Sequence, residues 1–105
     1  MINTLNEHIY ISYNHLYIEE DRNSAILLGY KLSLTKTEYL ILKELVKSGK
    51  LPISAKDITS RTGLNLSKEN LAFHIFNINS KAKAISNRIL IKNISKIGYF
   101  LNEEM

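Results

Sequence analysis

The basic side chains of the C-terminal third are the residues of this 105-residue chain whose type and spacing point to chemistry. No carboxylate occurs between Glu69 and Glu103. Five cationic residues lie in that interval: Lys81, Lys83, Arg88, Lys92 and Lys96. Cations of this kind attract phosphate groups by charge and reach rather than by a particular shape. The pattern indicates a surface that faces a polyanion, although a plainly solvated basic face explains the charge equally well.

Catalytic and metal-binding chemistry has no comparable support in the sequence. The chain has no Cys, which excludes disulfides and thiolate zinc sites and fits a reducing compartment. His8 and His15 have no carboxylate at ligand spacing, and His74 beside an apolar stripe is interpreted as a packed structural residue. No Gly-rich phosphate loop occurs, and no Ser is paired with a His at a recognisable spacing. We therefore expect no enzyme activity, no metal site and no cofactor.

Length, composition and charge predict a single domain over residues 1–105 with one basic pole. The chain is 45% hydrophobic with one Pro and four Gly, as in ordinary globular domains that bury one modest core. Residues 1–30 have a net charge of −3, whereas residues 31–105 carry 13 basic and 6 acidic side chains. No leader pattern and no run of roughly 20 apolar residues is present. We expect a cytoplasmic protein with no membrane association.

The elements that must position these cations change their hydrophobic period at residue 34. Before that point, short alternating segments separated by turn residues predict a small antiparallel sheet over about residues 8–34. After it, the period of 3.6 residues predicts helices over residues 35–86. Residues 87–102 return to two short strands joined through a turn that contains Gly98, which predicts a β-hairpin.

Three helix starts share the same capping chemistry. Each places a hydroxyl residue at the N-cap and a polar residue three positions later, as in the pairs Thr35 with Glu38, Ser54 with Asp57, and Ser67 with Asn70. The first helix is expected over about residues 36–48 and the second over about 55–62, before Gly63. The short interval between Gly63 and Ser67 is helix-turn-helix spacing.

The third predicted helix has one apolar stripe and a contrasting outward face. At about 100° per residue, the stripe consists of Leu71, Ile75, Ile78, Ala82 and Ile85. The opposite face carries Glu69, Ala72, Phe73, Phe76, Asn77, Ser80, Lys83 and Ala84. Such a helix can enter a major groove, where Asn bonds adenine and an apolar side chain meets the thymine methyl group. The alternative is a face that is simply solvated, or covered by the sheet or by a partner.

Four segments in order extend this pattern to nearly the whole chain: YKLSLTKTEYLILKELV, ISAKDI, FHIFNI and IKNISKIGYFL. Together they resemble the winged helix-turn-helix effector domain of the OmpR/PhoB family of bacterial response regulators, over about residues 8–102. The resemblance implies an α+β fold with a four-stranded N-terminal sheet, a three-helix core and a C-terminal hairpin wing. It also implies a transcription regulator that binds double-stranded DNA as a homodimer on paired half-sites. The phosphorylatable receiver domain usual in the family is not expected in this chain, because few residues precede the first strand.

The helix face, the charge pattern and the resemblance together give expected roles to positions of this sequence. Base edges are expected to contact Ala72, Phe76, Asn77 and Ser80. The DNA backbone is expected to contact Lys68, Lys81, Lys83, Arg88, Lys92 and Lys96. The wing tip is expected at Ser95, Lys96, Ile97 and Gly98. The family often has Arg around Phe76, Asn77 and Asn79, and an Arg-Gly pair where this chain has Ser95 and Lys96, so base reading should differ here.

Two function classes therefore compete. The first is a sequence-specific DNA-binding regulator whose third helix lies in the major groove with the wing on the backbone. The second is a winged-helix interaction or dimerisation module that has lost base reading and docks a protein through Phe76 or Phe100. Exposed rings at these positions favour a contact surface, whereas buried rings mean that the predicted helix register is wrong.

Overall fold

The computed structural model of the chain describes residues 2–5 and 8–104, so the predicted domain over 1–105 includes a few positions outside the described residues. Its N-terminal part is an antiparallel sheet whose strands follow one another in chain order, with β1 at one edge and β5 at the other. The strands are β1 (Ile2–Leu5), β2 (His8–Tyr13), β3 (Leu16–Glu19), β4 (Ser24–Leu27) and β5 (Tyr30–Leu32), with the short 3-10 helix η1 (Glu20–Arg22) before β4. The expected antiparallel sheet is confirmed, and it has one edge strand more than the four that the resemblance implies. The segment before residue 8 adds β1, which pairs with β2.

Three helices follow, as the capping pattern predicts: α1 (Lys36–Ser48), α2 (Ala55–Thr62) and α3 (Lys68–Ser86). At α1, Thr35 Oγ1 accepts a hydrogen bond from the Glu38 amide at 3.2 Å, and the Glu38 carboxylate accepts one from the Thr35 amide at 2.9 Å. The Ser54 and Ser67 hydroxyls each accept a bond of 3.1 Å from the amide three residues later. These contacts satisfy amides that lack partners inside the helix, so each helix begins at a residue set by local sequence.

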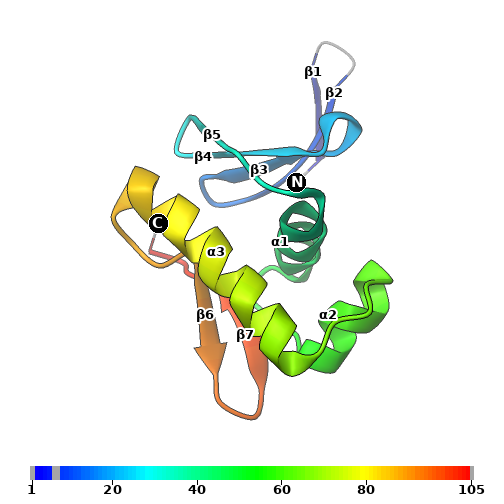
Figure 1. The fold of residues 1–105 in the computed structure, drawn as a ribbon. Coiled ribbons are helices and arrows are strands. Elements are labelled where there is room, and N and C mark those ends of the chain that lie inside the picture. The colour runs from blue at the N-terminus through cyan, green and yellow to red at the C-terminus, as the bar shows by residue number, and fades with distance from the viewer. Residues whose placement is uncertain (1, 6–7, 105) are drawn as a thin grey trace.

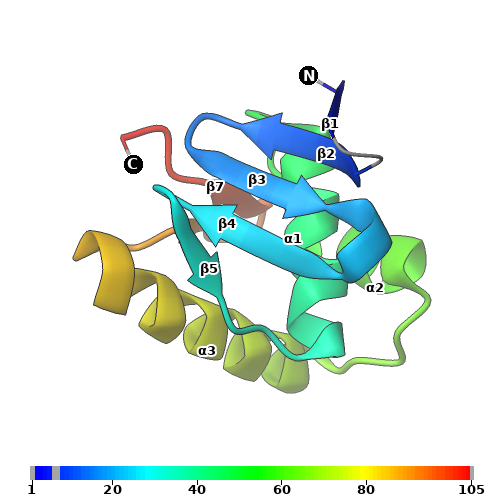
Figure 2. The ribbon, with the colours of Figure 1, turned by 90° about the horizontal axis from the view of Figure 1, so that it is seen from above.

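The wing is the two-stranded hairpin of β6 (Ile91–Ile94) and β7 (Gly98–Leu101). A short bridge fixes β7 to the segment before α2, because the amides of Ile53 and Tyr99 each donate to the other's carbonyl at 2.8 Å. In Figure 1 the sheet lies at one end of the molecule, the helices lie in the middle, and the hairpin projects from the opposite end. Figure 2 shows the sheet covering α1, with α3 running along the outer side of the molecule.

The core lies where the sheet, the helices and the base of the hairpin meet. Buried side chains come from every layer, including Ile18 of β3, Leu42 of α1 and Leu101 of β7. Four members of the predicted apolar stripe of α3 are buried, Leu71, Ile75, Ile78 and Ala82, and the fifth, Ile85, is half-buried against the core. Its packing is what turns the opposite face of α3 outward. Within the described residues, no helix combines the length and apolarity that crossing a bilayer requires.

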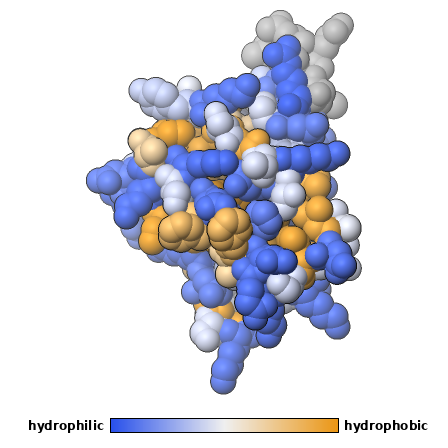
Figure 3. All heavy atoms as spheres, viewed as in Figure 1, coloured by the Kyte–Doolittle hydropathy of each residue, from blue (hydrophilic) through white to orange (hydrophobic). Residues whose placement is uncertain are grey.

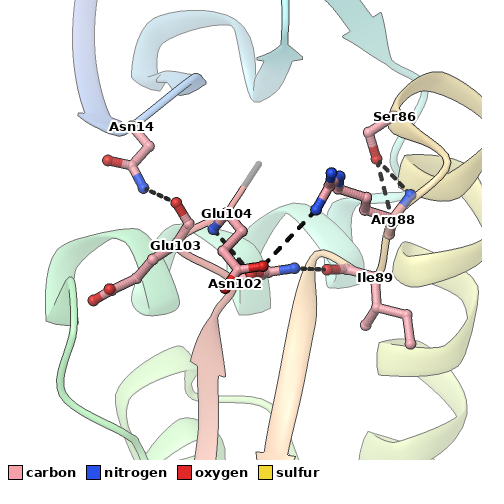
Figure 4. Close-up of polar contacts among 7 residues, drawn as sticks. All are labelled: Asn14, Ser86, Arg88, Ile89, Asn102, Glu103 and Glu104. Atoms are coloured by element: carbon pink, nitrogen blue, oxygen red, sulfur yellow. Dashed lines mark hydrogen bonds and ion pairs between the residues drawn. The ribbon is translucent and has the colours of Figure 1, made fainter.

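The segment after β7 fastens the base of the wing to the rest of the fold. The Asn102 side chain donates to the Ile89 carbonyl at 2.8 Å and accepts from the Glu104 amide at 3.0 Å. The Asn14 side chain, in the turn between β2 and β3, donates to the Glu103 carbonyl at 3.2 Å. Figure 4 shows these contacts converging from the sheet, the end of α3 and the end of β7. The hairpin therefore projects from a fixed base.

Candidate nucleic-acid interface

The outward face of α3 is uncovered. No strand or helix lies over it in either of the two ribbon views (Figures 1 and 2). Phe73 and Phe76 are 61% and 67% exposed, and Ala72, Ser80 and Lys83 are also exposed. Figure 3 shows apolar side chains over α3 surrounded by hydrophilic ones. Phe76 is therefore exposed, and the alternative of a buried ring in a wrong helix register does not apply to it.

Two asparagines close together on α3 have different environments. The Asn79 side chain donates to the Ile91 carbonyl at 3.0 Å and accepts from the Ile91 amide at 2.8 Å, so it joins α3 to β6. Asn77 is half-buried, and its side chain makes no hydrogen bond to any residue that the structure describes. An amide with unused donors and acceptor beside an open face can bond the edge of a base. Of the two, Asn77 alone is available for reading.

Lys81, which is expected on the DNA backbone, forms an ion pair with a buried carboxylate of α1. Its ammonium lies 2.6 Å from the Glu38 carboxylate, whose side chain is 3% exposed, while that of Lys81 is 36% exposed. Burial alone raises the pKa of Glu38, but the bonds from Lys81 and the Thr35 amide and the charges of Lys81 and His74 outweigh it, so the pKa of Glu38 is lowered. Lys81 therefore compensates a buried carboxylate, and a phosphate would have to compete with that carboxylate for it.

The remaining cations lie around α3 and the wing. Lys68, Lys83, Lys92 and Lys96 are exposed, and none of them makes an ion pair within the described part of the chain. Arg88 is exposed at the base of the wing, 3.9 Å from the Glu104 carboxylate (Figure 4). A surface pair at that distance contributes little, so this guanidinium can exchange its partner for a phosphate.

A cleft of about 360 Å³ separates the wing from the first turns of α2 and α3. Three lysines line it, one from each element: Lys56, Lys68 and Lys96. The N-terminal turns of helices also present partial positive charge and amide groups. The cleft thus collects cationic groups from segments far apart in the sequence, at the point where the hairpin approaches the helix-turn-helix.

The exposed wing tip is shorter than predicted. Ser95, Lys96 and Ile97 are exposed, as expected, but Gly98 is buried and begins β7. A Cβ atom at Gly98 would lie 2.2 Å from the Ile53 carbonyl oxygen, so only glycine fits against that backbone. Gly98 therefore sets the position of the wing and does not belong to its tip. Lys96 adopts a left-handed conformation, with φ of 66°.

Comparisons with solved structures identify the architecture. The DNA-binding domain of CpxR from E. coli is 22% identical, with a TM-score of 0.73 over 88% of this chain and 94% of that chain. The response regulator AdeR DNA-binding domain, in complex with an intercistronic region, is 18% identical, with a TM-score of 0.78 over 87% of this chain and 97% of that chain. The Klebsiella pneumoniae RstA DNA-binding domain, in complex with the RstA box, is 17% identical, with a TM-score of 0.75 over 90% of this chain and 98% of that chain.

This chain has the OmpR/PhoB-type winged-helix fold. No protein-family model matches its sequence, and no curated protein does. At these identities the likeness is one of backbone, so the roles of individual side chains in this winged helix must come from their own contacts. The expected α+β fold, with a three-helix core and a hairpin wing, is confirmed.

Two residues of this winged helix were missing from the predicted interface. Lys56 lies in the first turn of α2 and lines the cleft, next to the bridge between Ile53 and Tyr99 that joins the wing to the segment before α2. No local sequence pattern predicts that bridge. Phe73 is different, because the helical wheel already placed it on the outward face. Its exposure and its position one turn before Phe76 make it part of the same surface.

The structure also places His74, which the sequence analysis interprets as a packed structural residue. His74 is half-buried on α3, and its ring meets the Phe73 ring edge to face, with 5.7 Å between the ring centres. Among the residues that the structure describes, no three His, Asp or Glu side chains come together in a group that could hold a metal ion. His74 thus packs against the aromatic surface of α3.

Proposed function

We propose that this chain is a sequence-specific DNA-binding transcription regulator, with α3 in the major groove and the wing beside the DNA backbone. The observation that carries the proposal is the open face of α3, which ends at the lysine-lined cleft beneath the wing. Cations at the rim hold phosphates, while the side chains between them meet the base edges. The DNA complexes of AdeR and RstA, which have the same fold, support this assignment.

The proposed roles follow the contacts of each side chain. The residues proposed to face the bases lie on the outward half of α3: Asn77, Phe76, Ala72 and Ser80. Phosphates are bound by Lys56, Lys68, Lys83, Arg88, Lys92 and Lys96. Lys81 is left out of the phosphate set because its ammonium pairs with the buried Glu38 carboxylate. The family pattern further supports a homodimer on paired half-sites, which two successive shifted bands on a two-half-site duplex would reveal.

Salt dependence tests phosphate binding. If about four to six phosphates are neutralised, log Kd should change with log salt concentration with a slope of roughly 0.9 for each contact. Lys96→Ala should lower the slope by about 0.9 and weaken binding to all sequences alike. Lys31→Ala provides the control, because Lys31 is an equally exposed lysine on β5, in the sheet. An unchanged slope in Lys96→Ala would remove the wing from the interface.

Base reading needs its own test. Random-site selection should yield a preferred sequence, and Asn77→Ala should lose about 1–3 kcal/mol on it while relaxing preference at one base pair. The Asn77 side chain makes no hydrogen bond to any described residue, so a changed preference would report on DNA contact. If the variant retains the full preference of the wild type, Asn77 does not read bases.

The rival function is protein docking through the exposed Phe76 ring. Phe100 on β7 is half-buried, so it offers less apolar surface to a partner than the exposed Phe76 does. An apolar interface would be nearly insensitive to salt, in contrast to a phosphate-binding surface. Association that persists unchanged from low to high salt, without any DNA shift at low ionic strength, would favour docking over DNA binding.

A further inference from the structure

The exposed aromatic pair of α3 is the feature that DNA binding in general does not explain. Phe73 and Phe76 are both more than half exposed, although burying either ring would stabilise a fold. They are three residues apart, or about 4.5 Å along the helix axis, so both lie on the outward face of α3 within one turn. The His74 and Phe73 rings pack edge to face.

The chemistry of the groove says what this surface fits. Among the groups that base pairs present in the major groove, the apolar one is the thymine methyl group. Neighbouring base pairs are about 3.4 Å apart, which is similar to the helix rise of about 4.5 Å between Phe73 and Phe76. Two rings so spaced can each cover a methyl group on adjacent or nearly adjacent base pairs.

The polar side chain of α3 nearest to the two rings on the bound face favours the same base pairs. Asn77, one turn beyond Phe73, has an unused amide of the kind that bonds adenine bidentately. Arginine, the commonest reader of guanine, is absent from α3 over its whole length. Lys83 can bond guanine, but it lies about 10 Å along the axis from Phe76, toward the end of the helix.

We infer that Phe73 and Phe76 read thymine methyl groups, so that the preferred target is a run of A·T base pairs in the major groove. This inference rests on the proposed function, because it assumes that α3 enters the groove. It assigns the exposed aromatic surface to DNA and makes Phe73 a specificity-determining residue. A protein partner on the same rings is the competing occupant, and the test below separates the two.

The experiment removes the methyl groups from the DNA. Random-site selection with the 105-residue chain defines the bound sequence, and each thymine in it is then replaced singly by deoxyuridine. This substitution deletes the methyl group and keeps the base pairing. We expect about fourfold weaker binding for each contacted thymine, from the usual worth of one buried methyl-sized group. Replacements outside the contacted positions should leave Kd unchanged.

Variants assign the effect to the rings. In Phe76→Ala, thymine and deoxyuridine should bind alike at one position, and in Phe73→Ala they should bind alike at a second, neighbouring position. Both rings are exposed, so neither substitution opens a cavity in the core. Leu51→Ala is the matched control, because Leu51 is 73% exposed and lies outside α3. It should keep the discrimination of the wild type.

Each outcome decides between the claims. A selected site made of G·C pairs, or specific binding that no deoxyuridine replacement weakens, would overturn methyl reading while leaving the DNA-binding proposal intact. A deoxyuridine effect that survives in both Phe variants would also overturn it. Absence of any DNA shift at low salt would overturn the proposed function, and the methyl-reading inference with it.

Discussion

Two lysines on the last turns of α3 should respond in opposite ways to substitution. Lys81 donates to the Glu38 carboxylate at 2.6 Å, whereas Lys83 is exposed and makes no ion pair with any described residue. Lys81→Met leaves the buried carboxylate with the Thr35 amide at 2.9 Å as its remaining partner. A hydrogen bond to a charged group contributes about 1.5–3 kcal/mol, and the partial exposure of Lys81 reduces this to about 1–2 kcal/mol. Lys83→Met should stay within about 0.5 kcal/mol of the wild type.

Urea denaturation at neutral pH measures the stability side of this prediction. With a slope of about 2 kcal/mol per molar urea, in the middle of the usual range, the midpoint of Lys81→Met should fall by roughly 0.5–1 M. DNA titrations measure the other side. Lys83→Met should lower the salt slope by about 0.9, whereas Lys81→Met, still folded in the absence of urea, should keep the wild-type slope. Equal stability of the two variants, or loss of slope in Lys81→Met, would refute the assignment of Lys81 to the fold.

The pH dependence of the same pair has a definite sign. The pKa of Glu38 is lowered in the folded protein, so its contribution to stability is fully present above the usual Glu pKa of about 4.3 and is lost as pH falls through the folded value. The stability gap between the wild type and Lys81→Met should therefore narrow as pH falls below about 5. A gap that stays constant down to about pH 3 would show that Lys81 acts through its hydrocarbon stem instead.

Three further substitutions test the placement of the wing. Gly98→Ala should cost about 1–3 kcal/mol more than Gly29→Ala in urea denaturation, because both residues have positive φ but only a Cβ at residue 98 would strike backbone atoms. Asn79→Ala removes both side-chain bonds to Ile91, so it should lower the free energy of unfolding by about 1–2 kcal/mol. It should also weaken binding to all DNA sequences alike. Retained base preference would distinguish Asn79 from a residue that reads bases. Lys96→Gly should raise the unfolding midpoint slightly while lowering the DNA salt slope by about 0.9.

The helices could be predicted closely because the signals that define them are local. Thr35, Ser54 and Ser67 each bond an amide three residues ahead, so the start of every helix is written within a few positions. The change of hydrophobic period at residue 34 likewise separates sheet from helices. The additional strand β1, which pairs with β2, was not predicted because it precedes residue 8, where the resemblance begins.

The candidate site was less predictable because its decisive contacts join distant segments. Lys81 and Glu38 are 43 residues apart, and no local rule connects them. The bonds between Asn79 and Ile91 cross from α3 to the hairpin, and the fit of Gly98 against Ile53 depends on the closed fold. A wheel identifies the outward face of a helix, but which polar groups on that face are already bonded depends on what packs beside it.

Lys96 connects the energetics of the wing with its proposed role. Its φ of 66° is a conformation that costs a lysine roughly 1–2 kcal/mol and a glycine almost nothing. The OmpR/PhoB family, which this sequence resembles, often has glycine at this position, so the turn itself favours glycine. The lysine is nevertheless exposed at the tip and lines the cleft shared with Lys56 and Lys68. Strain kept at an exposed position is expected where the side chain contributes to function, since the fold gains nothing from it. The proposed contact of Lys96 with the DNA backbone would explain why this chain keeps a strained residue at the end of its wing.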